Sequence, residues 1–179
     1  MCADDVGYGE DSILMKPIIL GIDPGLHGAL AFVELVGGTP RVEVFDMPTT
    51  TKKVGTIHRS RIAKDALTEL IASRIHTLRC VVIEDVHALP KDGPVQAFTF
   101  GYGLGLLHGI CQVYDLPVVN VPPQVWKSKY GLNSDKHKSR AVASRFFPHN
   151  ASVWSRAKDD GRAEAALLGL LGFTEGWGA

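Results

Sequence analysis

The chain has 179 residues, 45% hydrophobic and 21% charged, with 19 basic and 19 acidic side chains that cancel. These values fit one globular domain and exclude a disordered, collagen-like or coiled-coil protein. The three cysteines, Cys2, Cys80 and Cys111, form no Cys-x-x-Cys motif. Their spacing argues against a disulfide scaffold or a thiolate zinc site and favours a reducing cytoplasm.

The chain begins with an acidic segment. Residues 1–14 contain four acidic and no basic side chains, which fits neither a secretory signal nor a transit peptide. We therefore expect a cytoplasmic protein. Its expected organisation is a flexible tail at 1–15, one domain at 16–174 and a short tail at 175–179, with Met15 marking the start of the folded unit.

The first half of the chain predicts three strands followed by a helix. Apolar, β-branched segments at 17–22, 28–36 and 41–46 predict strands, the last two joined by a hairpin at 37–40. A polar loop at 48–55 leads to a predicted helix at about 60–74. Its apolar residues, from Ile62 to Ile71, recur at the helical spacing of three and four.

The second half predicts strands that alternate with helices. A uniformly apolar strand at 80–83 precedes an uncharged helix at about 98–114, and a strand follows at 117–121. One or two basic helices end near Phe147, and a last helix runs from about 160 to 172. This order predicts an α/β fold with a five-stranded mixed sheet, antiparallel in its first three strands and parallel in the remainder, with helices on both faces.

The uncharged stretch at 94–114 holds four glycines, together with Gln96, Thr99, His108 and Gln112. These residues are poor for a membrane span, so we expect a buried helix of a soluble protein. Three of the glycines, at 101, 105 and 109, share one helix face, which predicts close packing there.

Basic side chains gather near the end of the chain. Residues 124–158 carry eight Lys or Arg against Asp135 alone, a net charge of +7, and the other residues sum to −7. This asymmetry indicates a face that binds a polyanion, and Trp126, Tyr130 and Trp154 within it could stack on bases. A solvated helix face is the alternative.

Four acidic residues at element boundaries predict a metal site. Asp23 and Glu84 end the first and fourth strands, which are expected to be parallel neighbours, and Asp160 and Glu164 share one face of the last helix. Asp159 is an alternative ligand to Asp160. Clustered carboxylates repel unless cations neutralise them, and oxygen ligands select Mg²⁺ or Mn²⁺. Two such ions about 4 Å apart hydrolyse phosphodiesters. The alternative is a plain turn at Asp23 and a helix cap at Asp159 or Asp160.

Together these blocks resemble the RuvC-like Holliday junction resolvases of the ribonuclease H-like superfamily, over roughly residues 17–173. The three acidic blocks of that family are similar to Gly21-Ile-Asp-Pro-Gly25, Val82-Ile-Glu84 and Asp160-Gly-Arg-Ala-Glu-Ala165. Its junction-contacting block is similar to Val121-Pro-Pro-Gln-Val-Trp-Lys127 followed by Lys138. The Trp-Lys pair, Phe147-Pro148 and the Asp-Gly-Arg-Ala-Glu ending are most like the subgroup of phage and bacterial RuvC-like nucleases and plant chloroplast resolvases.

The resemblance implies a ribonuclease H-like fold and a homodimer that resolves four-way DNA junctions by paired symmetric nicks. It implies two Mg²⁺ ions per active site, replaceable by Mn²⁺, on Asp23, Glu84, Asp160 and Glu164. The expected DNA contacts are Trp126, Lys127, Lys129, Lys136, Lys138, Arg140 and His87. Helix 98–114 is the candidate dimer seam, with packing against the sheet as the alternative.

The sequence departs from the RuvC pattern in two places. The last acidic pair is four residues apart instead of three, which leaves the ligand role open between Asp159 and Asp160. His87 stands where RuvC has an aromatic residue at the junction core.

Three other classes of protein share part of this pattern. A ribonuclease H-like nuclease acting on RNA–DNA hybrids or flaps and a non-catalytic branched-DNA-binding module both stay open. The actin-like ATPases and sugar kinases share the opening Gly-x-Asp-x-Gly but need a duplicated domain, so we expect no nucleotide cofactor, and no membrane partner.

Overall fold

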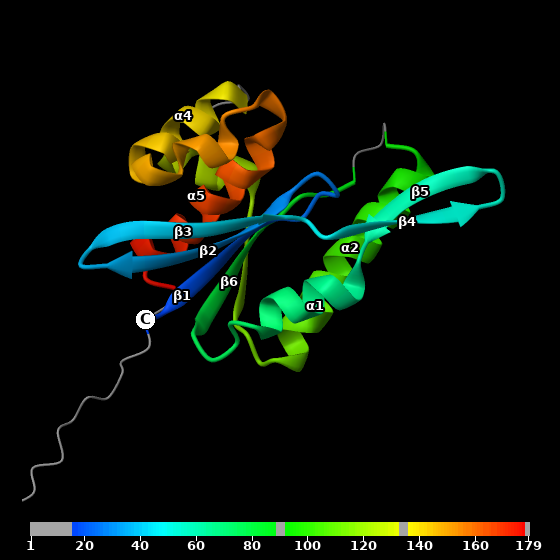
Figure 1. Ribbon diagram of the computed structural model, residues 1–179, viewed down its shortest axis with the longest axis horizontal. Coiled ribbons are helices and arrows are strands. Elements are labelled where there is room, and N and C mark those ends of the chain that lie inside the picture. The colour runs from blue at the N-terminus through cyan, green and yellow to red at the C-terminus, as the bar shows by residue number, and fades with distance from the viewer. Residues whose placement is uncertain (1–15, 89–91, 133–135, 178–179) are drawn as a thin grey trace, which may run out of the picture.

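The computed structural model describes residues 16–88, 92–132 and 136–177, without the side chains of residues 54, 136 and 137. Its centre is a five-stranded mixed sheet in the order β3-β2-β1-β6-β7 (Figure 1). β1 pairs antiparallel with β2, and β2 with β3, whereas β1–β6 and β6–β7 are parallel. The predicted sheet is therefore confirmed. The strands are β1 (Ile18–Asp23), β2 (Ala29–Val36), β3 (Thr39–Asp46), β6 (Leu78–Glu84) and β7 (Val118–Val121).

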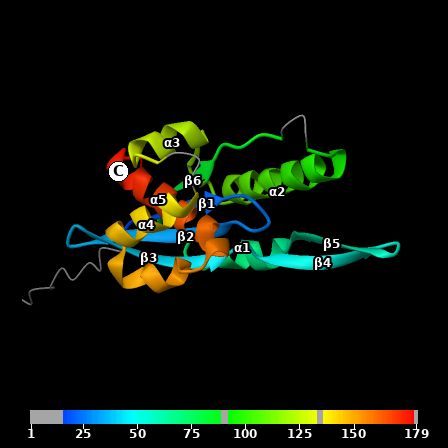
Figure 2. The ribbon, with the colours of Figure 1, turned by 90° about the horizontal axis from the view of Figure 1, so that it is seen from above.

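Helices cover both faces of the sheet, as the alternating order predicts (Figures 1 and 2). Side chains of β1 alternate between the two cores: Ile19 packs on one side and Leu20 and Ile22 on the other. The first side holds α3 (Pro123–Lys129), α4 (Lys136–Phe146), α5 (Asp160–Thr174) and the short 3₁₀ turns η1 (Pro148–Trp154) and η2 (Ala157–Asp159). The second side holds α1 (Lys64–Ala72) and α2 (Pro94–Val113).

Glycine brings α5 into direct contact with β1. A Cβ atom on Gly21 would lie 2.1 Å from the carbonyl oxygen of Ala165 and 2.3 Å from the amide nitrogen of Gly169. No larger residue fits between the two backbones, so the helix lies directly over the central strand. This contact fixes the first turn of α5 above the end of β1, where Asp23 lies.

A second hairpin replaces the predicted loop at 48–55 and the start of the predicted helix at 60–74. β4 (Thr49–Val54) pairs antiparallel with β5 (Ile57–Ile62), and α1 begins only at Lys64. The two-residue connection starts at Gly55 with φ +63°, as Gly-first hairpin loops require. The spacing of Ile62 predicts a place in the helix, but this residue is buried at the end of β5.

Among the described residues, no helix is both long enough and apolar enough to span a membrane.

Candidate active site

Asp23 and Glu84 lie side by side at one edge of the sheet. The parallel pairing of β1 and β6 sets Ile22 opposite Ile83, and the two acids are the next residues of their strands. Neighbouring strands are about 4.8 Å apart, so both carboxylates leave the same edge. This adjacency is the one predicted from the crossover through the first helix.

The first turn of α5 closes over Asp23. A Cβ atom on Gly161 would lie 2.7 Å from Oδ2 of Asp23 and 3.1 Å from the carbonyl oxygen of His27. A Cβ atom on Gly28 would lie 2.2 Å from the carbonyl oxygen of Asp23. Glycine at both positions therefore makes room for this carboxylate, and Oδ1 accepts a hydrogen bond from the Gly25 amide at 3.3 Å.

Glu84 is a buried acid with a raised pKa. Its side chain is buried, and burial raises the pKa of Glu84 from 4.5 to about 7. Trp126 opposes this increase because its Nε1–H donates a hydrogen bond to Oε1 at 2.9 Å. The charges of Asp23 and Glu164 raise the pKa of Glu84 further. Acids from β1, β6 and α5 are thus electrostatic neighbours.

Two residues from α3 and α4 contact Glu164. Its Oε1 accepts a hydrogen bond from the Ser139 hydroxyl at 3.0 Å, and the Lys127 ammonium lies 3.6 Å away. The Lys127 ammonium also lies 5.0 Å from the centre of the Trp126 ring. Sequence reasoning missed Ser139, and it placed Lys127 on a DNA surface without its contact to the acids.

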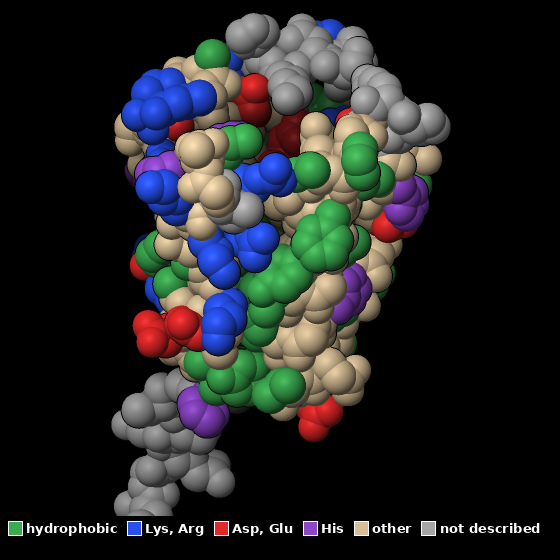
Figure 3. All heavy atoms as spheres, turned by 90° about the vertical axis from the view of Figure 1, so that its right-hand side faces the viewer, with side chains coloured by type: hydrophobic (Ala, Val, Ile, Leu, Met, Phe, Trp, Pro, Cys, Tyr) green, Lys and Arg blue, Asp and Glu red, His purple; other side chains and the backbone are tan. Residues whose placement is uncertain are grey.

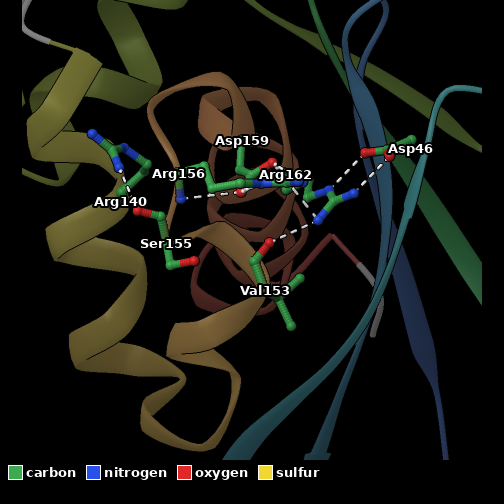
Figure 4. Close-up of polar contacts among 7 residues, drawn as sticks. All are labelled: Asp46, Arg140, Val153, Ser155, Arg156, Asp159 and Arg162. Atoms are coloured by element: carbon green, nitrogen blue, oxygen red, sulfur yellow. Dashed lines mark hydrogen bonds and ion pairs between the residues drawn. The ribbon is translucent and has the colours of Figure 1, made fainter.

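Asp160 points toward a cation of α4. Its Oδ1 lies 2.9 Å from Nε of Arg140. The Nη1 of Arg140 also donates to the carbonyl oxygen of Ser155 at 3.2 Å (Figure 4). Asp23 and Glu84 are thus adjacent at the strand ends, and the charges of Asp23 and Glu164 act on Glu84, while Asp160 forms an ion pair with Arg140.

Asp159, the alternative ligand to Asp160, is held by two arginines in this structure. Both carboxylate oxygens accept hydrogen bonds from the Arg156 side chain, at 2.8 and 2.9 Å, and these bonds lower the pKa of Asp159. Arg162 lies 3.8 Å from Asp159 and donates two bonds to Asp46 at the end of β3 (Figure 4). The Arg162 Nη1 also donates to the carbonyl oxygen of Val153. This network attaches η1 and the start of α5 to the sheet.

Of the three aromatics predicted to stack on bases, Trp126 and Trp154 are buried in the structure, whereas Tyr130 is partly buried. Trp126 is 0% exposed and Trp154 is 1% exposed. Nε1 of Trp154 donates to the Ser144 hydroxyl at 2.9 Å. The Tyr130 hydroxyl donates to the carbonyl oxygen of Leu167 at 2.8 Å. These rings form the core between α3, α4 and α5, and Trp126 in addition orients Glu84.

The remaining predicted DNA contacts stay predictions. Lys138 is exposed on α4, and the side chain of Lys136 lies outside the described residues. Lys129 forms an ion pair with Glu175 at 2.8 Å, beyond the far end of α5. His87 is exposed, with Nε2 3.8 Å from Asp85.

The chemistry of the clustered acids fits a hard divalent cation. Asp23, Glu84 and Glu164 offer only carboxylate oxygens, the ligand type that Mg²⁺ and Mn²⁺ prefer. Within the described parts of the chain, no group of three or more His, Cys, Asp or Glu side chains is placed so that it could hold a metal ion. Mg²⁺ usually binds through one or two carboxylates together with waters and substrate phosphates. Metal binding by these carboxylates would therefore depend on further ligands, such as waters and a substrate phosphate.

Comparison with known proteins gives one relative in sequence and several in fold. No protein-family model matches the chain. The chloroplastic Holliday junction resolvase MOC1 of Chlamydomonas reinhardtii is 33% identical over 82 residues, which are 45% of this chain and 9% of that protein. Thermus thermophilus RuvC in complex with a Holliday junction substrate has a TM-score of 0.56 at 15% identity, covering 89% of this chain and 96% of RuvC. A second T. thermophilus RuvC structure gives the same values. The chain therefore has the ribonuclease H-like fold of RuvC and resembles the RuvC-like Holliday junction resolvases in sequence and structure.

Proposed function

We propose that this protein is a Mg²⁺-dependent endonuclease that resolves four-way DNA junctions by paired symmetric nicks. The observation that supports the proposal is that Asp23 and Glu84 end adjacent parallel strands of a RuvC-like sheet, with the charge of Glu164 on α5 acting on Glu84. These acids come from β1, β6 and α5, far apart in the chain. The burial of negative charge at one point is unfavourable without a cation, so the cluster supports metal binding.

Asp23, Glu84 and Glu164 would hold the metal, with Asp160 joining them if it leaves Arg140. Two bound Mg²⁺ ions, or Mn²⁺ in their place, would activate the attacking water and stabilise the leaving oxygen of a phosphodiester. Trp126 orients Glu84 by its hydrogen bond, and Ser139 orients Glu164.

Basic groups beside the acids would hold the DNA backbone. Lys127 lies 3.6 Å from Glu164, so its ammonium can contact a phosphate that is bound at the carboxylates. Lys138 lies one residue before Ser139 and is exposed on α4. Both lysines belong to the segment with net charge +7.

The proposed assembly is a homodimer that uses the exposed face of α2. Phe98, Tyr102 and Val113 are exposed on this helix. The glycines at 101, 105 and 109 have open space where a Cβ atom would lie. A two-fold dimer would present two active sites to a junction of approximate two-fold symmetry, as paired nicks require.

Asp23→Asn is the test of this function. The variant should lose Mg²⁺-dependent cleavage of a synthetic four-way junction while its junction affinity stays within a few-fold, since the amide keeps the size of the side chain. The control is Asp65→Asn, which changes an exposed acid on α1. Plain duplex, a flap and an RNA–DNA hybrid serve as competing substrates. Preferred cleavage of a hybrid or flap, or tight junction binding without any cleavage by the unmodified protein, would refute the resolvase.

A further inference from the structure

The hairpin β4–β5 is a separate arm of the molecule. It forms its own two-stranded sheet and does not pair with the central one. In Figures 1 and 2 it extends beyond the sheet, next to the amino-terminal half of α2. Ile62 anchors its base, with Cδ1 2.8 Å from where a Cβ atom on Gly103 would lie. Isolated two-stranded hairpins are only marginally stable. The extended part of this hairpin therefore contributes little to the stability of the fold, which suggests a role in binding.

The arm carries positive charge without acids to balance it. Residues 49–62 contain Lys52, Lys53, Arg59 and Arg61 and no Asp or Glu. None of these four cations forms an ion pair with any part of the chain that the structure describes. The charges on this arm are therefore available to a ligand.

The register of the hairpin concentrates these charges. Lys52 is directly opposite Arg59, and Thr50 is opposite Arg61, so the two strands place three cations on one face. Like charges directly opposite each other destabilise a strand pair. In addition, Nε of Arg59 is buried without a hydrogen-bond partner among the described residues. An anionic ligand would relieve both unfavourable features.

The arm is close to the carboxylates. A pocket of about 490 Å³ lies between β5, the β1–β2 loop and the first turns of α2, lined by residues that include His27, Ile57, Arg59, Val95 and Gln96. His27 is four residues after Asp23, so the two Cα atoms are within about 14 Å of each other even along an extended chain. Figure 3 looks onto this end of the molecule, where Lys and Arg side chains gather beside a band of hydrophobic ones.

We propose that hairpin β4–β5 and this pocket bind the sugar–phosphate backbone of a DNA strand that leaves the carboxylate site. The inference rests on the proposed function and adds a second contact surface to it, on the opposite side of the sheet from the basic α3–α4 segment. Lys52, Arg59 and Arg61 bind phosphates. The apolar side chains of Ile57 and Val95 in the pocket contact the sugar and base of the same strand. A site for phosphate alone would be lined by polar and basic groups, whereas this lining is partly apolar.

The test is a triple variant, Lys52→Gln with Arg59→Gln and Arg61→Gln. Its affinity for a four-way junction is measured by fluorescence anisotropy in EDTA, between 50 and 200 mM NaCl (about the range over which counterion release is well resolved). We expect Kd to rise at least about tenfold at low salt, and the slope of log K against log [NaCl] to become shallower by about 0.7 to 0.9 for each phosphate that the variant no longer binds.

A matched control removes three exposed cations at the other end of the sheet, by Lys16→Gln, Arg41→Gln and Arg79→Gln. Equal losses of affinity in the two triple variants, or an unchanged salt slope in the hairpin variant, would refute the proposed DNA binding by hairpin β4–β5. If the hairpin variant melts early, the exposed single change Arg61→Gln is used, with an expected slope change of about one phosphate. An unmodified protein that neither binds nor cleaves junctions would refute the proposed function itself, and the arm with it.

Discussion

Trp126→Phe should separate the effect of the Trp126–Glu84 hydrogen bond from the packing of the Trp126 ring in the core. The substitution keeps an aromatic ring in a site that is 0% exposed, and it removes the Nε1–H that donates to Oε1 of Glu84 at 2.9 Å. The ionised carboxylate would then be buried with one hydrogen bond fewer. We therefore expect the pKa of Glu84 to rise above about 7, and cleavage to slow because the carboxylate loses its orientation.

The expected magnitude follows from hydrogen-bond energies. A buried hydrogen bond to a charged group contributes about 1.5–3 kcal/mol, against about 0.5–1.5 kcal/mol for one between neutral groups. Ionised Glu84 should thus lose about 1 kcal/mol more than protonated Glu84. This difference corresponds to an increase of the pKa by roughly one unit. The smaller ring also leaves a packing defect, whose cost does not depend on pH.

The assay is denaturant unfolding of the metal-free protein in EDTA at pH 5 and pH 9. Trp126→Phe should lower the free energy of unfolding by about 1 kcal/mol more at pH 9 than at pH 5. Trp154→Phe is the control, because this buried Trp donates to the neutral Ser144 hydroxyl, also at 2.9 Å. Its loss of stability should be equal at the two pH values. An equal loss at both pH values for Trp126→Phe as well would refute the role assigned to the Trp126–Glu84 bond.

Two further predictions concern the same acids. Because the pKa of Glu84 is raised from 4.5 to about 7, the folded protein binds a proton on Glu84 between these pH values and the unfolded chain does not. The free energy of unfolding of the metal-free protein should therefore fall by about 3 kcal/mol as pH rises from 4.5 to 7. Glu84→Gln should flatten this pH dependence, and an unchanged curve would contradict the raised pKa of Glu84. Gly161→Ala should reduce cleavage at least about tenfold with junction binding retained, because the added Cβ would lie 2.7 Å from Oδ2 of Asp23. The control is Gly93→Ala, whose added Cβ would have nothing within 4 Å. Equal cleavage activity of the two variants would argue against the crowding of Asp23.

The sequence was sufficient to predict the central sheet. Continuous apolar runs at β1 and β6 and alternation of strands with helices determine which strands are parallel. Parallel neighbours end at the same edge, so the sequence alone could place Asp23 and Glu84 together. Spacing along one helix placed Glu164 on the same face as Asp160.

Hairpin β4–β5 was missed because most of its described side chains are exposed. Thr49–Val54 shows no alternation of apolar and polar side chains, which is the signal for a half-buried strand. Ile62, the buried anchor of the hairpin, matched the helical spacing of the residues that follow it.

Only the tertiary structure decided which partners these acids and aromatics contact. The segment 124–158 has a net charge of +7 whether Trp126 faces DNA or the core. The burial of Trp126 depends instead on how α3 packs against α5. Likewise, Asp159 and Asp160 are adjacent in sequence, yet Arg156 binds one and Arg140 the other. Local patterns determine which elements form, whereas the partners of a buried polar group come from distant segments and exist only after those segments pack together.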